Sequence, residues 1–84
     1  MIKVLYFARL REQLGTAGEE IAPAAELETV GDVAAKLRER GGTWLEILGE
    51  GESVMVAVNQ ETARLETRVG DGDEVAFFPP VTGG

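Results

Sequence analysis

The sequence predicts a two-layer α+β fold, in which one main helix packs on one face of a mixed sheet of about four to five strands. Three observations support this expectation. Strand-like apolar runs stand near both ends of the chain, and the strongest helical pattern lies between them. The 84 residues, of which 44% are hydrophobic, are sufficient for one compact domain.

Residues 2–8 are rich in branched and aromatic side chains, which predicts the first strand. Successive side chains alternate between the two faces of a strand. The two faces are formed by Ile2, Val4 and Tyr6 on one side and by Lys3, Leu5 and Phe7 on the other. Because both faces are largely apolar, we expect this strand to lie in the centre of the sheet.

The next segments predict a short helix and an edge strand. Arg9 to Leu14 can form a helical turn, and Gly15 is a residue that commonly ends a helix. Glu19 to Ala22 read as a weak strand at a sheet edge, because Pro23 follows and cannot donate a ladder hydrogen bond.

The main helix is predicted to begin at Thr29, whose hydroxyl can cap the first turn together with the carboxylate of Asp32. An apolar stripe with helical spacing follows, made of Val30, Val33, Ala34 and Leu37. Arg38 and Arg40 suit the negative end of the helix dipole, and Gly41 provides the stop. A second short helix is expected from Trp44 to Leu48, with Trp44 in a core or lid position.

The remaining elements complete the sheet. Strands are expected at Ser53–Val58, weakly at Ala63–Thr67, and at Glu74–Phe78, with turns at Asn59–Gln60 and Asp71–Asp73. This order of elements is that of the β-grasp, or ubiquitin-like, fold, in which the first and last strands are parallel and central. We expect residues 1–78 to form this domain and residues 79–84 to form an extended C-terminal Gly-Gly tail.

The composition disfavours several classes of function. The chain has no cysteine and no histidine, so it lacks a thiol nucleophile, the usual general base and the commonest metal ligands. This favours a carrier or binding module over a catalyst, and no bound cofactor is expected. A net charge of −7 disfavours nucleic acid and anionic membranes as partners. It suits docking onto a basic protein surface, and the alternative is that the charge only aids solubility. The sequence shows no signal peptide or membrane-spanning stretch, which predicts a cytoplasmic location.

The last residues, Thr82-Gly83-Gly84, follow a proline pair at Pro79 and Pro80. Glycine has no Cβ and can enter a channel too narrow for side chains, while proline suppresses coiling. Six residues span roughly 20 Å when extended, which would carry the carboxylate of Gly84 into the active site of a partner. The alternative is a frayed terminus without a function.

An apolar patch is expected on the sheet face that the helix leaves uncovered. Alternation from Lys3 and Glu74 places Leu5, Phe7, Ala76 and Phe78 on this face. Such a patch usually marks a partner interface, and aromatic residues are typical anchors of interfaces. The alternative is that the loop of residues 43–52 covers it.

Two segments, Val58-Asn59-Gln60 and the run from Asp71 to Gly84, closely resemble the small, sulfur-carrier subunit of molybdopterin synthase. Residues 2–8, with Arg11, Glu12 and Gly15, are also similar to that ubiquitin-like family. The resemblance implies that a ubiquitin-activating-like adenylyltransferase consumes ATP to adenylate Gly84. A sulfur donor then leaves a thiocarboxylate, and the large synthase subunit transfers its sulfur to cyclic pyranopterin monophosphate within a heterotetramer.

The resemblance also implies roles for individual residues. Gly84 would carry the sulfur and Gly83 would allow passage through the channel of the large subunit. The partner-binding candidates are Leu5, Phe7, Arg11, Phe78, Pro80, Val81 and Thr82. The sequence departs from the family at Thr62-Ala63, where an aliphatic residue is expected. A carrier for thiamine or another pathway, a ubiquitin-like modifier and a non-catalytic interaction module remain alternatives.

Overall fold

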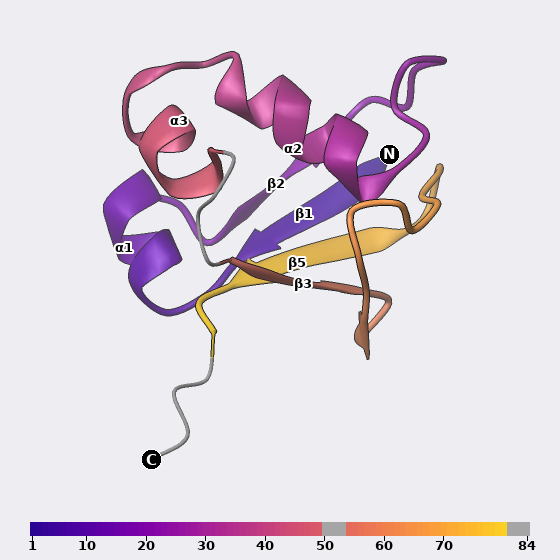
Figure 1. The fold of residues 1–84 in the computed structure, drawn as a ribbon. Coiled ribbons are helices and arrows are strands. Elements are labelled where there is room, and N and C mark those ends of the chain that lie inside the picture. Colours follow the sequence, from indigo (N-terminus) through magenta and orange to yellow (C-terminus); the bar gives the residue numbers. More distant parts are fainter. Residues whose placement is uncertain (50–53, 81–84) are drawn as a thin grey trace.

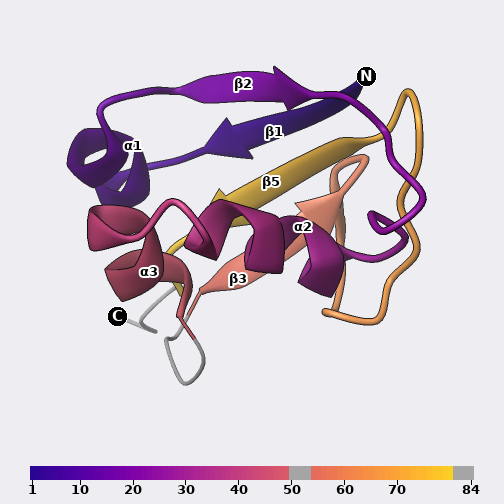
Figure 2. The same ribbon diagram turned by 90° about the horizontal axis from the view of Figure 1, so that it is seen from above.

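The computed structural model describes residues 1–49 and 54–80, and this part of the chain forms a mixed five-stranded sheet covered on one face by helices (Figure 1). The elements follow in the order β1 (Ile2–Tyr6), α1 (Arg9–Leu14), β2 (Gly18–Ile21), α2 (Val30–Arg38), α3 (Gly42–Leu48), β3 (Met55–Val58), β4 (Glu61–Thr62) and β5 (Glu74–Phe78). Seen from above, α2 and α3 lie across the strands, while α1 stands at the end of β1 (Figure 2). Of the helices in the described ranges, none has the length and apolar character needed to cross a membrane.

The strands are arranged in the order β2-β1-β5-β3-β4. β1 and β5 pair in parallel at the centre, while the other neighbours are antiparallel. This confirms the predicted β-grasp architecture and the central position of the first and last strands. The first strand ends at Tyr6 and not at Ala8, because Ala8 has a φ of 54°, which an extended strand cannot accommodate.

The core lies between the sheet and α2. The inward residues of β1 are Ile2, Val4 and Tyr6, each at most 1% exposed. The predicted helical stripe faces them and is equally covered: Val30, Val33, Ala34 and Leu37 are all at most 4% exposed. The alternation of β1 and the 3.6-residue period of α2 therefore identify the two facing surfaces of the core.

The start of α2 is fixed by the predicted capping box. The Thr29 hydroxyl accepts a hydrogen bond from the N–H of Asp32 at 3.2 Å, and the Asp32 carboxylate accepts from the N–H of Thr29 at 3.1 Å. That carboxylate also accepts from the N–H of Glu28 at 3.0 Å. These backbone donors, that of Glu28 foremost, lower the pKa of Asp32. The carboxylate that caps the helix is thus charged near neutral pH.

The strand predicted at Ala63–Thr67 is wrong, because the fourth strand is the two-residue β4 instead. The turn at Asn59–Gln60 returns the chain at once, so Glu61 already lies opposite Val58. The segment after β4 hydrogen-bonds to the N-terminus of α2 instead of extending the sheet. The carbonyls of Leu65 and Thr67 accept hydrogen bonds from the first N–H groups of α2, at 2.8 and 3.0 Å. These donors have no partner inside the helix, so satisfying them draws the segment away from the sheet.

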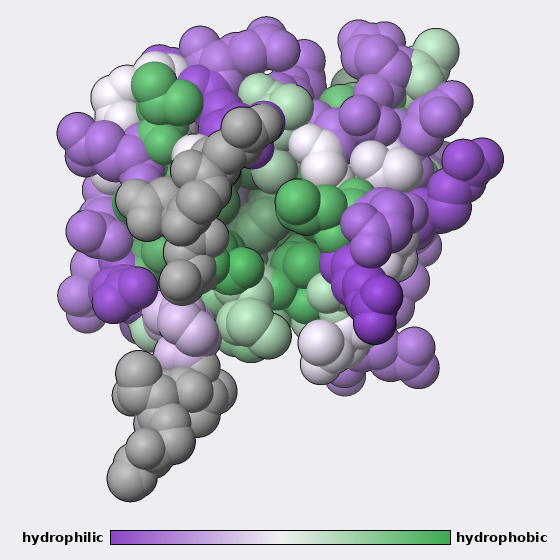
Figure 3. All heavy atoms as spheres, in the orientation of Figure 1, coloured by the Kyte–Doolittle hydropathy of each residue, from purple (hydrophilic) through white to green (hydrophobic). Residues whose placement is uncertain are grey.

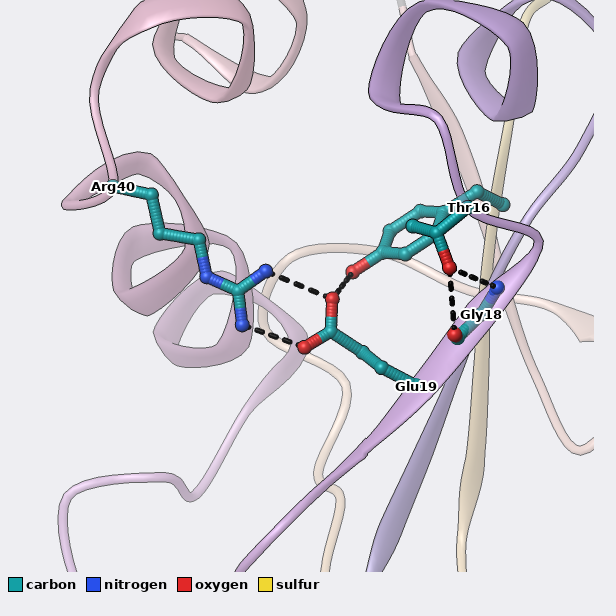
Figure 4. A network of polar contacts seen from close by, with 5 residues as sticks. Thr16, Gly18, Glu19 and Arg40 are labelled. Carbon is teal, nitrogen blue, oxygen red and sulfur yellow. Dashed lines mark hydrogen bonds and ion pairs between the residues drawn. The ribbon is translucent and has the colours of Figure 1, made fainter.

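A polar network ties β2 to the segment between α2 and α3. The Glu19 carboxylate accepts from both guanidinium nitrogens of Arg40, at 2.6 and 2.8 Å, and from the hydroxyl of Tyr6 at 2.9 Å (Figure 4). Arg40 also lies 4.4 Å from the ring centre of Trp44, which packs edge-on against Tyr6. Trp44, expected in a core or lid position, is partly buried and packs against the core as a lid. Arg40 is the main cause that lowers the pKa of Glu19, and burial raises the pKa of Tyr6.

We predict that Gln60→Gly stabilises the domain by about 0.5–1 kcal/mol. Gln60 has a φ of 69° and follows Asn59 at 50°, so both residues of the hairpin turn are left-handed. Asparagine tolerates this conformation, but glutamine is strained in it, and Asn-Gly is the preferred pair for such turns. Urea unfolding measures the change. Gln60→Ala, which keeps the strain, is the control, and equal stability of both variants would contradict the explanation.

We predict that Glu19→Gln lowers the free energy of unfolding by about 1 kcal/mol at neutral pH. The amide still accepts from Tyr6 but loses the charge that pairs with Arg40. Because the folded pKa of Glu19 lies below its ordinary value of 4.5, the contribution of the ion pair is present above pH 4.5. It is lost as the pH falls through the folded pKa. The free energies of unfolding of both proteins should therefore approach each other as the pH falls below 4.5 and through the folded pKa, and a gap that does not change with pH would refute the ion pair.

Candidate functional site

The face of the sheet opposite α2 carries an apolar patch. Strand register places Leu5 beside Ala76, Ala76 beside Ala57, and Phe78 beside Met55. Phe7 follows the end of β1, and its N–H donates to the carbonyl of Phe77 at 3.1 Å, which continues the ladder by one step. By alternation, Phe7 then shares the face of Leu5. We call this set the apolar patch: Leu5, Phe7, Met55, Ala57, Ala76 and Phe78.

Its members differ in exposure. Phe7 is 46% and Met55 39% exposed, whereas Leu5, Ala57 and Phe78 are half-buried. Ala76 was expected to add to the exposed surface, but it is only 9% exposed. Its side chain is small and lies on a central strand between two neighbours, so it forms the floor of the patch. Large exposed apolar side chains grouped in this way typically bind a partner protein.

The alternative that residues 43–52 cover this patch is not supported by their described part. Residues 43–48 belong to α3, which packs on the core side of the sheet. Trp44 contacts Tyr6 there, and Ile47 and Leu48 are buried in the core. Residues 50–53 lie outside the described ranges. The described part of this segment therefore supports the helix layer and leaves the patch open.

Sequence reasoning missed Met55 and Ala57. Alternation along β3 separates them from the inward Val56, but the pattern does not reveal which strand lies next to β5. Only the observed antiparallel register, with Met55 opposite Phe78, brings both residues into the patch. Figure 3 views the molecule from the side on which the helices and β3 lie in front, and there hydrophobic residues gather around β3, between hydrophilic residues on either side; the open face of the sheet points away from this view.

The patch lies at the end of the sheet from which the chain continues toward its C-terminus. Because β1 and β5 are parallel, Phe7 and Phe78 both stand where their strands end, and α1 is at the same end (Figure 1). Pro80 is partly exposed just beyond β5, and Arg11 is exposed on α1. The predicted residues Val81, Thr82, Gly83 and Gly84 lie outside the described ranges. The structure thus brings together Leu5, Phe7, Phe78 and the base of the predicted tail.

The described residues offer binding rather than acid–base chemistry at this face. The groups with shifted pKa values belong to structural networks: Tyr6, Glu19 and Arg40 on the helix side, Asp32 in the α2 cap, and Asp73 in a turn. Two hydrogen bonds to the carboxylate lower the pKa of Asp73: the larger effect comes from the side-chain amide of Asn59 and the smaller from the backbone N–H of Gly70. Within residues 1–49 and 54–80, no group of three or more carboxylates is placed to hold a metal ion. The patch itself consists of apolar side chains and contains no titratable group.

Comparisons with known proteins agree with this geometry. Residues 4–84 match the ThiS family. The chain is 44% identical over 84 residues to the molybdopterin synthase sulfur carrier subunit of Escherichia coli (strain K12), covering 100% of both chains. Small archaeal modifier protein 1 of H. volcanii superposes with a TM-score of 0.75 at 31% identity, over 95% of this chain and 97% of that one. A complex of subunits 1 and 2 of molybdopterin-converting factor from Helicobacter pylori 26695 contains a chain that matches with a TM-score of 0.67 at 26% identity, covering 99% and 97%.

We predict that Phe78→Asp leaves the domain folded, whereas Phe77→Asp unfolds it. Phe77 is 2% exposed in the core, so a carboxylate there costs several kcal/mol, a large share of the roughly 5–15 kcal/mol stability of a typical domain. Phe78 lies on the open face and should lose only about 1 kcal/mol. Circular dichroism with urea unfolding distinguishes the two. Loss of structure in Phe78→Asp would show that the strand faces are assigned wrongly.

Proposed function

The chain belongs to the ThiS family, and from this premise we propose that it is the sulfur carrier subunit of molybdopterin synthase. The observation that carries the proposal is the strand register. It places an exposed apolar patch directly beside the base of the segment that leads to Gly84. A docking surface next to a bare glycine carboxylate is what a carrier needs in order to present its terminus to another protein.

The proposed reaction begins at the carboxyl group of Gly84. A carboxylate is a poor electrophile because its oxygen is a poor leaving group, so an ATP-dependent enzyme of the ubiquitin-activating type first adenylates it and releases pyrophosphate. A sulfur donor then attacks the acyl carbon and displaces AMP, which leaves a thiocarboxylate. We place this chemistry in the cytoplasm, where ATP is available. Gly83 would let the terminus pass through a channel too narrow for a side chain.

The second half of the proposal is sulfur delivery. The thiocarboxylate is an anionic, soft nucleophile and needs no base from this chain, which has neither histidine nor cysteine. The large synthase subunit would bind the apolar patch, receive the tail and transfer the sulfur to cyclic pyranopterin monophosphate. Two such transfers would build the dithiolene, in a heterotetramer with two copies of each subunit. Phe7 and Phe78 would serve as anchors, Arg11 would lie at the rim, and Pro80, Val81 and Thr82 would line the path.

The likeness to small archaeal modifier protein 1 supports a second candidate function. In it, the activated Gly84 carboxyl is joined to lysines of other proteins. The two candidates differ in the bond that forms at the same carbon, a thiocarboxylate or an amide. Intact-mass analysis of the chain isolated from its native host separates them, because sulfur for oxygen and a covalent protein adduct change the mass differently.

We predict that removal of Gly84, or addition of one residue after it, abolishes sulfur transfer and leaves the fold intact. Either change moves the reactive carboxyl by about 3.5 Å, which is enough to misplace it in a partner's active site. The measurement is dithiolene formation with the activating enzyme and the large subunit present. Glu39→Gln, on the helix layer, is the control, and full activity of the shortened chain would refute the carrier function.

A second test concerns docking. Phe78→Asp should weaken binding to the large subunit by at least tenfold, since aromatic anchors at an interface centre contribute about 2 kcal/mol or more. Titration calorimetry with the purified large subunit measures this, and Leu45→Asp provides the control because Leu45 is an exposed apolar residue of α3, away from the patch. Equal affinity of Phe78→Asp and the unmodified chain would place the interface elsewhere.

A further inference from the structure

The open face also carries a charged row at the end opposite the apolar anchors. Register places Lys3 between Glu20 on β2 and Glu74 on β5. These three residues, which we call the charged row, share the face of Leu5 by alternation. Lys3 and Phe7 are four positions apart, so the row lies about 13 Å from the aromatic end of the patch. The face is therefore apolar beside the base of the tail and charged at its far end.

A hollow lies beside Leu5 at the Lys3 and Glu20 end of the charged row. A groove of about 460 Å³ is lined by Lys3, Leu5, Ala17, Gly18, Glu19 and Glu20. Its floor is apolar, formed by Leu5 with Ala17 and Gly18. A side chain does not fit at Gly18, since a Cβ there would lie 2.7 Å from the carbonyl oxygen of Val4 and 2.9 Å from a methyl group of Leu5. The Glu19 side chain is turned away to Arg40, so the carboxylate at the edge of the groove on this face is that of Glu20.

The carboxylates of the charged row are not neutralised by ion pairs within the described ranges. There, ion pairs within 4.0 Å join the N-terminus to Asp71, Arg40 to Glu19, and Arg68 to Glu28. Neither Glu20 nor Glu74 takes part in one. Lys3 is the single cation between two carboxylates, so the row keeps one net negative charge in a chain of net charge −7.

We propose that the groove and charged row receive a basic side chain, arginine or lysine, from the large subunit. The inference rests on the proposed function. The long apolar stem of such a side chain fits the floor of Leu5 and Gly18, and its cationic head reaches Glu20 at the edge of the groove. Glu74, on the other side of Lys3, adds to the negative potential of this end of the face. An apolar stem followed by a cation matches the order of surfaces in the groove, which neither an acidic nor a purely apolar side chain would satisfy.

A contact at the charged row, in addition to the aromatic anchors, would affect how the carrier is oriented on its partner. Apolar burial is non-directional, so the aromatic anchors alone hold the carrier without fixing its rotation on the partner. An ion pair about 13 Å away fixes that rotation. It thereby aligns the strand axis of β5, and the chain that follows it, with the entrance of the partner's active site. Complementary charge also speeds the encounter, and salt screens this effect.

The test measures association of the purified large subunit with charge variants by stopped-flow fluorescence, at about 0.05 and 0.5 M salt. Glu20→Gln combined with Glu74→Gln should associate about three- to tenfold more slowly at low salt, with a flatter salt dependence. Lys3→Gln should associate about twofold faster, because it removes the competing cation. The matched control combines Glu39→Gln with Glu46→Gln, two exposed carboxylates of the helix layer. It removes the same net charge, and the change in the logarithm of its association rate should be less than about half of that for the Glu20→Gln/Glu74→Gln variant.

Two outcomes would overturn the inference: equal rates for the two double variants, or slower association of Lys3→Gln. Phe78→Asp separates this inference from the proposed function. If Phe78→Asp binds weakly and the charge variants associate at the unmodified rate, the docking through the aromatic residues is supported and the contact with a basic side chain is refuted. If Phe78→Asp binds like the unmodified chain, the proposed docking itself fails.

Discussion

The parallel pairing of β1 with β5 is the constraint on which the rest of the structure depends. Parallel strands need a long crossover, so every element between Phe7 and Asp73 forms part of the connection that returns the chain to the same end. The pairing buries Val4 and Val75 completely in the core. It also makes both strands finish side by side, which sets Phe7 next to Phe78. One backbone arrangement thus creates the core on one face and the aromatic end of the apolar patch on the other.

The edge strand β2 is occupied by a side chain at its first residue, Gly18. The N–H of Tyr6 donates to the carbonyl of Ala17 at 3.0 Å, so the backbone groups of the next residue, Gly18, point away from β1. The hydroxyl of Thr16 donates to the carbonyl of Gly18 at 3.0 Å and accepts from its N–H at 3.4 Å (Figure 4). This occupies an edge that could otherwise pair with another strand. The backbone of Gly18 is therefore not free to pair with an added strand at this end of the edge.

Local signals in the sequence predicted most elements, because capping, alternation and helical period act between near neighbours. The Thr29–Asp32 cap and the limits of β5 are of this kind. The misplaced strand at Ala63–Thr67 shows where such reasoning stops, since the carbonyls there satisfy donors of α2, more than thirty residues earlier in the chain. The contribution of Met55 to the patch and the pairing of Arg40 with Glu19 also depend on the tertiary arrangement. In the apolar patch, the sequence predicted Phe7 and Phe78. It did not predict Met55 and Ala57, because their membership depends on the pairing of β3 with β5.

The residues with shifted pKa values stabilise the fold and lie outside the apolar patch. Glu19, Arg40 and Tyr6 act on the helix side, and the carboxylates of Asp32 and Asp73 are held charged by hydrogen bonds in a cap and a turn. None of these groups belongs to the apolar patch. If the Gly84 carboxyl is the group that is loaded, as proposed, the patch presents the same surface before and after loading. A partner must then distinguish the two forms at the terminus itself, because the apolar patch contains no charged group.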